Sequence, residues 1–83
     1  MRLDKFLNAT NITKRRAIAQ DMCKSGAISI NGVQSKGAKE VRVNDLITLH
    51  FLESHVTYRV LKIPTLKTIP KAQKHEYIEK VQQ

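Results

Sequence analysis

Three consecutive basic residues, Lys14, Arg15 and Arg16, are the strongest chemical feature of this sequence. We expect them in the first turn of a helix, where they would span about 200° of its surface and could not all be buried. Cations at a helix N-terminus oppose the helix dipole. A phosphate placed there would relieve that conflict and would accept hydrogen bonds from the free backbone N–H groups. The run therefore predicts an anion-binding surface rather than a merely solvated turn.

Two more basic residues, Arg2 and Lys5, stand three positions apart near the N-terminus. A short amphipathic helix would put them on one side, because residues at i and i+3 are neighbours on a helix surface. Its other side would carry apolar residues at i, i+3 and i+4, which are Leu3, Phe6 and Leu7. We therefore expect Arg2, Lys5 and the 14–16 run to form one basic face on two helices.

Fifteen Lys or Arg residues and seven Asp or Glu residues give this 83-residue chain a net charge of +8. Residues 1–42 hold nine basic and three acidic residues, whereas residues 43–83 hold six and four. A charge polarised in this way indicates an anionic partner. Two Phe, two Tyr and no Trp leave few rings for stacking on single-stranded bases. Phosphate contacts and shape, as in structured RNA, are the expected basis of recognition.

Catalytic chemistry has little support in the sequence. A domain of this length cannot spare many residues for an enclosed active site. The glycine-rich loops that hold nucleotides are absent. The carboxylates are dispersed and form no recognisable acid–base pair; they are Asp4, Asp21, Glu40, Asp45, Glu53, Glu76 and Glu79. We therefore expect no catalytic residue, no cofactor and no enzymatic activity.

His50, His55 and Cys23 are the remaining candidates for metal or nucleophilic chemistry. The two histidines flank an expected hairpin and could bind a metal ion together, but no third ligand is evident. We interpret them as exposed strand residues. Cys23 lies on the expected apolar side of the second helix, so we interpret it as a small buried hydrophobe. A single cysteine also excludes an internal disulfide.

Membrane attachment is not indicated either. No apolar run approaches the roughly 20 residues of a membrane span. The N-terminus lacks the long apolar stretch of a signal peptide. We therefore expect a cytoplasmic protein.

Two helices must position the basic residues. Asp4 would lie in the first turn of the N-terminal helix, where the helix dipole favours an acidic group. A polar turn follows over residues 8–12, and Thr13 is the expected N-cap of a second helix over 14–25. Gly26 would end this helix, because glycine adopts the left-handed conformation after a helix C-terminus at no steric cost.

From residue 27 the pattern changes from helix to strand. The alternating segment 28–30, followed by Asn31-Gly32, predicts a strand and a tight type I′ turn. A second strand is expected over 46–51 and a third over 56–63. The second strand would carry on one side Ile47, Leu49 and Phe51.

These elements predict an α+β fold in which two N-terminal helices pack on a small antiparallel-rich β-sheet. We expect this domain to span residues 1–63. Two prolines indicate an extended linker over 64–71, and residues 72–81 can form a short polar helix. Residues 64–83 are thus expected to be a C-terminal extension. The expected core is Leu3, Phe6, Leu7, Ile28, Ile30, Val41, Leu46 and Ile47.

Three blocks that occur in order over about residues 1–50 carry a resemblance to a known family. They are Met-Arg-Leu-Asp-Lys-Phe-Leu, Thr-Lys-Arg-Arg-Ala and Lys-Ser-Gly-Ala-Ile-Ser-Ile-Asn-Gly. Together they resemble the S4-like RNA-binding domain of ribosomal protein S4. The resemblance implies a compact unit of two helices and a β-hairpin, the αL motif, whose basic face binds structured RNA.

The resemblance also implies which residues bind RNA. The second block departs from the family's common Ser-Arg pattern, with Thr13-Lys14 in its place. The hydroxyl and the charge are kept, although lysine lacks the bidentate geometry of arginine. The positions that match the family's RNA-binding positions are Arg2 and Lys5 in the first helix, Lys14, Arg15 and Arg16 at the start of the second, Asn31 in the hairpin and Lys36 in the loop after it.

A chain with this domain and almost nothing else is similar to a small stand-alone subgroup that acts in ribosome rescue and quality control. The implied partners are the large ribosomal subunit and structured RNA, namely its rRNA, with tRNA as a further ligand. We expect a cytoplasmic, non-enzymatic monomer that uses no cofactor or metal and binds no membrane. The alternatives are a DNA-binding module with the same basic face, and a protein-interaction or membrane-surface module.

Overall fold

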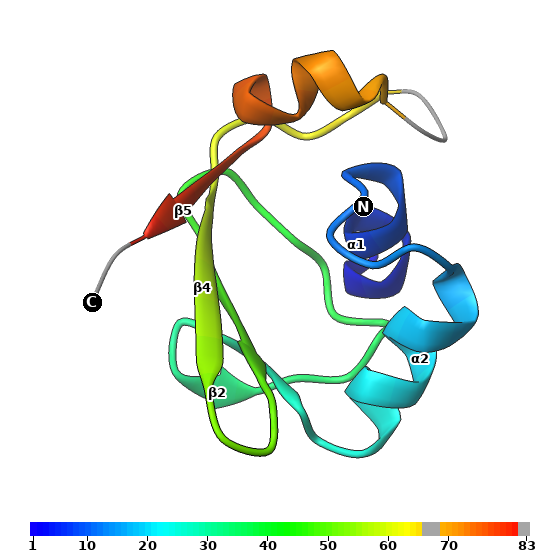
Figure 1. The fold of residues 1–83 in the computed structure, drawn as a ribbon, viewed down its shortest axis with the longest axis vertical. Helices are drawn as coiled ribbons and strands as arrows, with labels where there is room; N and C mark the ends of the chain where they lie inside the picture. Colours follow the sequence, from blue (N-terminus) through cyan, green and yellow to red (C-terminus); the bar gives the residue numbers. More distant parts are fainter. Residues whose placement is uncertain (66–68, 82–83) are drawn as a thin grey trace.

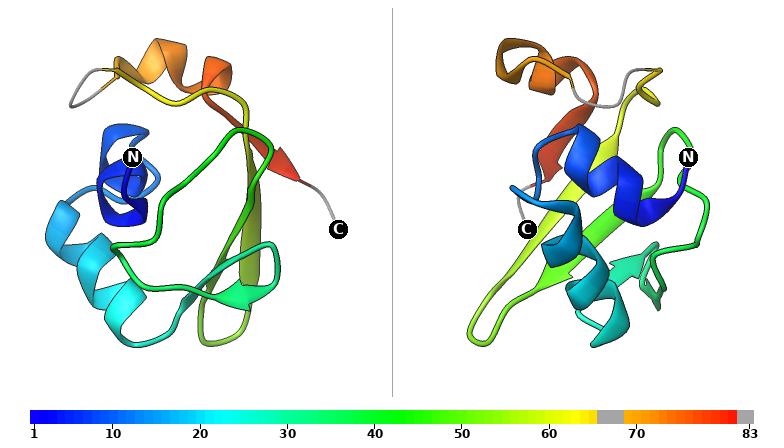
Figure 2. Two further views of the ribbon diagram at one scale, coloured as in Figure 1. Left: turned by 180° about the vertical axis from the view of Figure 1, so that it is seen from behind. Right: turned by 90° about the vertical axis from the view of Figure 1, so that its right-hand side faces the viewer.

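A computed structural model describes residues 1–65 and 69–81, apart from the side chain of Arg16. Two α-helices lie on one side of a five-stranded antiparallel sheet with the strand order β2-β1-β3-β4-β5 (Figures 1 and 2). The predicted α+β class is confirmed. None of the helices in these ranges has the length and apolar composition needed to cross a membrane. In chain order the elements are α1 Leu3–Ala9, α2 Arg16–Lys24, β1 Ile28–Ile30, β2 Val33–Gln34, β3 Leu46–His50, β4 His55–Val60, the 3₁₀ helix η1 Lys71–Glu76, and β5 Ile78–Val81.

The connection between the two α-helices differs from the prediction. Helix α2 begins at Arg16, and its N-cap residue is Arg15, whose side chain makes no capping hydrogen bond. The predicted N-cap, Thr13, is wrong, because its N–H donates to the Leu7 carbonyl oxygen at 3.1 Å and keeps it at the end of α1. Its hydroxyl is buried and finds no partner among the described residues. Lys14 and Arg15 therefore lie before the helix rather than in its first turn.

The end of α2 follows the sequence signal. Gly26 has a φ of 81°, and its N–H donates to the Cys23 carbonyl oxygen at 3.2 Å. The N–H of Ala27 donates to the Met22 carbonyl oxygen at 2.8 Å. These two bonds form a Schellman motif, which satisfies carbonyl groups that the helix leaves without partners.

The predicted turn at Asn31-Gly32 is confirmed. Asn31 and Gly32 have φ values of 52° and 81°, as a type I′ turn requires. They join β1 to β2, whose register pairs Ile30 with Val33. β1 also pairs with β3, so this hairpin is part of the main sheet.

The hairpin between β3 and β4 corrects two strand boundaries. β3 ends at His50, and the Phe51 N–H donates to the Ser54 carbonyl oxygen at 2.7 Å across the connection. Phe51 was expected on the same side as Ile47 and Leu49, but it lies beyond the strand and its side chain is 51% exposed. β4 spans His55–Val60 instead of 56–63.

The short polar helix predicted over residues 72–81 is present only in its first part, as a 3₁₀ helix, and its last part is a strand. η1 occupies Lys71–Glu76, and β5 then pairs antiparallel with β4, with Ile78 opposite Val60. Tyr77 and Ile78 are buried, so this segment covers one end of the core (Figure 1). An isolated polar helix has little to stabilise it, whereas a strand here pairs its backbone with β4. Residues 66–68 of the predicted linker lie outside the described residues.

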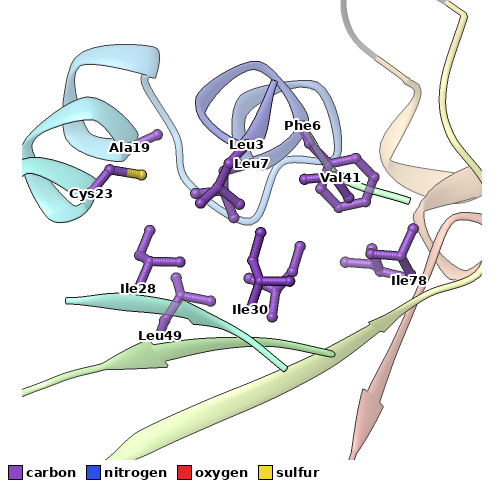
Figure 3. Packing of buried hydrophobic residues seen from close by; sticks show 12 residues of the cluster. Leu3, Phe6, Leu7, Ala19, Cys23, Ile28, Ile30, Val41, Leu49 and Ile78 are labelled. Atoms are coloured by element: carbon purple, nitrogen blue, oxygen red, sulfur yellow. The ribbon is translucent and has the colours of Figure 1, made fainter. Parts of the chain in front are cut away.

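The core lies between α1, α2 and the inner side of the sheet (Figure 3). Leu3, Phe6 and Leu7 are fully buried, and full burial of such a side chain stabilises the fold by about 1.5–3 kcal/mol. Leu46, expected in the core, is only half-buried, because it neighbours inward-facing Ile47 in β3. The other predicted core residues are buried, namely Ile28, Ile30, Val41 and Ile47.

Candidate nucleic-acid interface

Arg2 precedes α1 and is held by the buried carboxylate of Asp4. Its Nε donates to Asp4 Oδ1 at 3.3 Å and its Nη2 to Oδ2 at 3.1 Å. The Lys5 N–H also donates to Asp4 Oδ1, at 2.7 Å. The Arg2 side chain remains 54% exposed, whereas that of Asp4 is 1% exposed. The guanidinium group is thus held by a buried carboxylate and is still accessible to solvent.

The loop over residues 36–39 packs on the first turn of α1. The Leu3 N–H donates to the Lys39 carbonyl oxygen at 2.8 Å and the Asp4 N–H to the Gly37 carbonyl oxygen at 3.1 Å. A Cβ atom at Gly37 would lie 3.3 Å from Asp4 Cβ, so the loop approaches the helix closely. These contacts bring Lys36 beside Arg2.

Two hollows flank Arg2. The Lys5 hollow is lined by Met1, Arg2, Lys5, Ala38 and Glu40. The Lys24 hollow is lined by Arg2, Asp4, Gln20, Cys23, Lys24, Lys36, Gly37 and Ala38. Within the described residues, the ammonium groups of Lys5, Lys24 and Lys36 make no hydrogen bond or ion pair. The surface therefore carries positive charge that the fold does not neutralise.

The three basic residues at the start of the second helix are placed differently from Arg2 and Lys5. Lys14 lies in the connection between the helices and Arg15 is the N-cap of α2; both are exposed. Neither lines the Lys5 hollow or the Lys24 hollow. Arg16 is the first residue of α2, and its side chain lies outside the described part of the structure. Of the predicted site, the described side chains that come together are Arg2, Lys5 and Lys36.

Asn31 has a structural role in the turn that it begins. Its Nδ2 donates to Asp45 Oδ1 at 3.1 Å, and its Oδ1 accepts a hydrogen bond from the Leu46 N–H at 3.0 Å. The Asn31 side chain thus joins the β1–β2 turn to the start of β3. Its assignment as an RNA ligand stays a prediction.

Lys24 is the basic residue that sequence reasoning left out of the site. It lies four residues after Gln20, and each of them directly follows a buried residue, Cys23 and Ala19 respectively. That spacing places Gln20 and Lys24 beside the buried side of α2. This spacing could be seen in the sequence. It points to a binding surface only once the loop over residues 36–39 is known to pack opposite α2.

Cys23 and the histidines are also placed by the structure. Cys23 is buried, and desolvation, with a smaller effect of the Asp4 charge, raises the pKa of its thiol. His50 and His55 are opposite each other on β3 and β4 with ring centroids 6.2 Å apart. Within the described residues, no three His, Cys, Asp or Glu side chains come together in a way that could hold a metal ion.

Comparison with known proteins adds to this geometry. Residues 1–47 match the S4 domain family. The chain is 47% identical over 78 residues to the RQC P-site tRNA stabilizing factor of Helicobacter pylori strain J99, covering 94% of this chain and 93% of the relative. It is 43% identical over 60 residues to the protein of that name from Bacillus subtilis, covering 72% and 70%. The trimeric structure of Vibrio cholerae Heat Shock Protein 15 superposes with a TM-score of 0.86 at 27% identity, covering 98% of this chain and 81% of that one.

Proposed function

The chain belongs to the S4 domain family, and from that membership we propose that it binds structured RNA without catalysing a reaction. The ligand is rRNA of the large ribosomal subunit, with tRNA as a further ligand, and the setting is ribosome quality control. Relatives named as tRNA stabilizing factors support this proposal. The single observation that carries it is the gathering of Arg2, Lys5 and Lys36 around the first turn of α1.

Preorganisation supports this surface as a binding site. The two hydrogen bonds to Asp4 fix the orientation of the Arg2 guanidinium group before any ligand binds. The packing of the 36–39 loop on α1 fixes the backbone that carries Lys36. Phosphate oxygens accept hydrogen bonds from both lysine and arginine, and those bonds are strengthened by the charges.

The chemistry of the same surface favours binding over catalysis. Lysine and arginine side chains stay protonated near neutral pH, so they attract anions but are poor proton acceptors. The Asp4 carboxylate is buried against Arg2. Burial raises the pKa of the neighbouring Cys23 thiol, and a thiol is a weak nucleophile compared with its thiolate.

Co-sedimentation with purified large ribosomal subunits, and a gel shift with deacylated tRNA, would test the proposal. With about five phosphate contacts, log K should fall with log salt at a slope near −4. Arg2→Ala should weaken binding and make the salt dependence less steep, changing the slope by about one. Arg59→Ala is the matched control, since Arg59 is an exposed arginine in β4.

The Arg2→Ala variant also removes the guanidinium group that is bonded to the buried Asp4 carboxylate, so its thermal unfolding must be measured in parallel. Lys36→Ala provides a second variant that leaves this ion pair intact. Unchanged binding by both variants would overturn the proposed site. Duplex DNA that displaces structured RNA would instead favour the DNA-binding alternative. Binding retained at high salt would indicate a protein or membrane surface as the partner.

We also propose that the protein acts in the cytoplasm, where ribosomes are found, and that it is a monomer. The Vibrio cholerae relative has a trimeric structure, so the state of this chain needs a direct measurement. Light scattering coupled to size-exclusion chromatography should give the mass of one chain. A mass of three chains would contradict the monomer.

A further inference from the structure

Arg2 and Ala38 line both the Lys5 hollow and the Lys24 hollow. The two hollows are therefore neighbours, and Arg2 and Ala38 form the boundary that they share. A ligand that fills both must pass over this boundary.

The Lys24 hollow has the greater positive charge. Three cations line it, Arg2, Lys24 and Lys36, against one carboxylate, Asp4. That carboxylate lies beneath the surface and is bonded to Arg2. Charges of one sign around a concave surface reinforce one another and focus the field within it. The chemistry of this hollow therefore suits an anion of the size of a phosphate group.

The Lys5 hollow is less basic but still suits an anion. Arg2 and Lys5 line it together with one carboxylate, Glu40. Glu40 Oε2 lies 3.7 Å from Arg42 Nη2, so part of its charge is offset by this residue. Its polar lining resembles that of the Lys24 hollow with one cation fewer.

Ala38 has the smaller of the two side chains at this boundary. It is exposed and lies in the loop that is held on α1 through the carbonyl groups of Gly37 and Lys39. The Lys39 N–H also donates to the Lys36 carbonyl oxygen at 3.0 Å, which closes a turn around Ala38. A methyl side chain on this fixed turn lets another chain approach closely.

We propose that one RNA strand crosses this surface over Ala38, beside Arg2, with one phosphate in the Lys24 hollow and the neighbouring phosphate in the Lys5 hollow. Consecutive phosphates of a strand are joined by a single sugar, which would lie over Ala38. Lys24 is then a ligand of the first phosphate, with Arg2 and Lys36. This assignment rests on the proposed function and adds a path to it.

A neutral steric change separates this path from general attraction between charges. Ala38→Leu keeps the net charge and fills the boundary, so binding to purified large ribosomal subunits should weaken at least about tenfold. Ala72→Leu is the matched control on the exposed surface of η1 and should bind as the natural chain does. Lys24→Gln should weaken binding several-fold and lower the salt slope by about one.

The results distinguish failure of the proposed strand path from failure of the proposed function. If Arg2→Ala weakens binding while Ala38→Leu and Lys24→Gln bind normally, the path is overturned and the RNA-binding function stands. If Arg2→Ala and Lys36→Ala bind normally as well, the proposed site is overturned. If the natural chain binds neither large ribosomal subunits nor tRNA, the proposed function itself fails. If only Lys24→Gln binds normally, Lys24 is not a ligand. Thermal unfolding of each variant shows whether it is folded, and Lys24→Gln alters only an exposed helix residue.

Discussion

The surface around the first turn of α1 and the C-terminal segment 69–81 both carry lysines, yet the fold uses them differently. In the C-terminal segment, Lys74 Nζ donates to the Asn11 carbonyl oxygen at 3.3 Å. Lys62, which precedes this segment, also contacts it: its ammonium group lies 5.5 Å from the centroid of the Tyr77 ring. Near α1, the ammonium groups of Lys5, Lys24 and Lys36 have no such partner within the described residues.

The number of cations in a region therefore does not by itself locate a binding surface. A lysine that already contacts a carbonyl group or a ring must give up that contact, in part, before it binds a phosphate. A lysine beside a hollow with excess positive charge gains by binding one. We therefore expect substitutions near α1 to alter RNA binding and substitutions in residues 69–81 to alter stability.

The largest effect should come from Ile78→Ala in β5. Ile78 is 5% exposed, and removal of a buried isoleucine side chain costs about 2–5 kcal/mol. Urea unfolding should show this loss, whereas Glu79→Ala, an exposed change in the same strand, should leave stability nearly unchanged. RNA affinity, measured where the variant is folded, should equal that of the natural chain. A large loss of affinity there would remove the distinction between the two regions.

The next effect should be on binding alone. Lys36→Gln removes a cation from the Lys24 hollow, so affinity for large ribosomal subunits should fall by about 1–2 kcal/mol. The salt slope should decrease by about one. Lys71→Gln removes an exposed lysine from η1 and serves as the comparison. Equal losses in the two variants would mean that net charge, not position, controls binding.

A smaller effect is expected at Lys62, whose contact with Tyr77 is internal to the C-terminal region. Lys62→Ala should lower the free energy of unfolding by about 0.5–1 kcal/mol, the usual worth of an exposed cation–π contact. RNA affinity should not change. In a Tyr77→Leu background the same substitution should have almost no effect on stability, because the ring is gone.

The smallest effect is a pH dependence at Cys23. Burial raises the pKa of its thiol in the folded state, so the folded chain keeps the proton more tightly than the unfolded chain. This contribution to stability is complete below the unfolded pKa and is lost as the pH rises from the unfolded pKa through the folded pKa. The natural chain should lose stability more steeply than Cys23→Ala over that range. If the free energy of unfolding, measured in urea at pH 8–10.5, depends on pH equally in the two proteins, this prediction is contradicted.

The parts of the fold that could be predicted are those with local causes. The spacing of Leu3, Phe6 and Leu7 predicts α1 because a helix brings these positions to one side. Gly26 and the Asn31-Gly32 pair predict their turns because few residues adopt positive φ without strain. Thr13 shows the limit, since its hydrogen bond to the Leu7 carbonyl oxygen outweighs its preference as an N-cap.

The parts that escaped prediction depend on contacts distant in sequence. β5 forms because it can pair with the edge of β4. The local sequence of residues 72–81 does not show that such an edge lies nearby. Lys24 joins the candidate site because α2 packs opposite the loop that carries Lys36. The spacing of Arg2 and Lys5 predicts that they share a side of the first helix, and only the family resemblance adds Lys36. The separation of these residues from Lys14 and Arg15 required the start of α2 to be known.

The bond pair between Arg2 and Asp4 has a consequence for the entropy of binding. A free arginine side chain loses up to about 2 kcal/mol of rotamer freedom when it is immobilised. Here folding has already restricted Arg2, so less of that loss remains for the binding step. Asp4 occupies the N–H of Nε and one N–H of Nη2, which leaves the two N–H groups of Nη1 and the second N–H of Nη2 to meet an anion. An arginine used in this way binds as part of a rigid scaffold, not as a mobile charge.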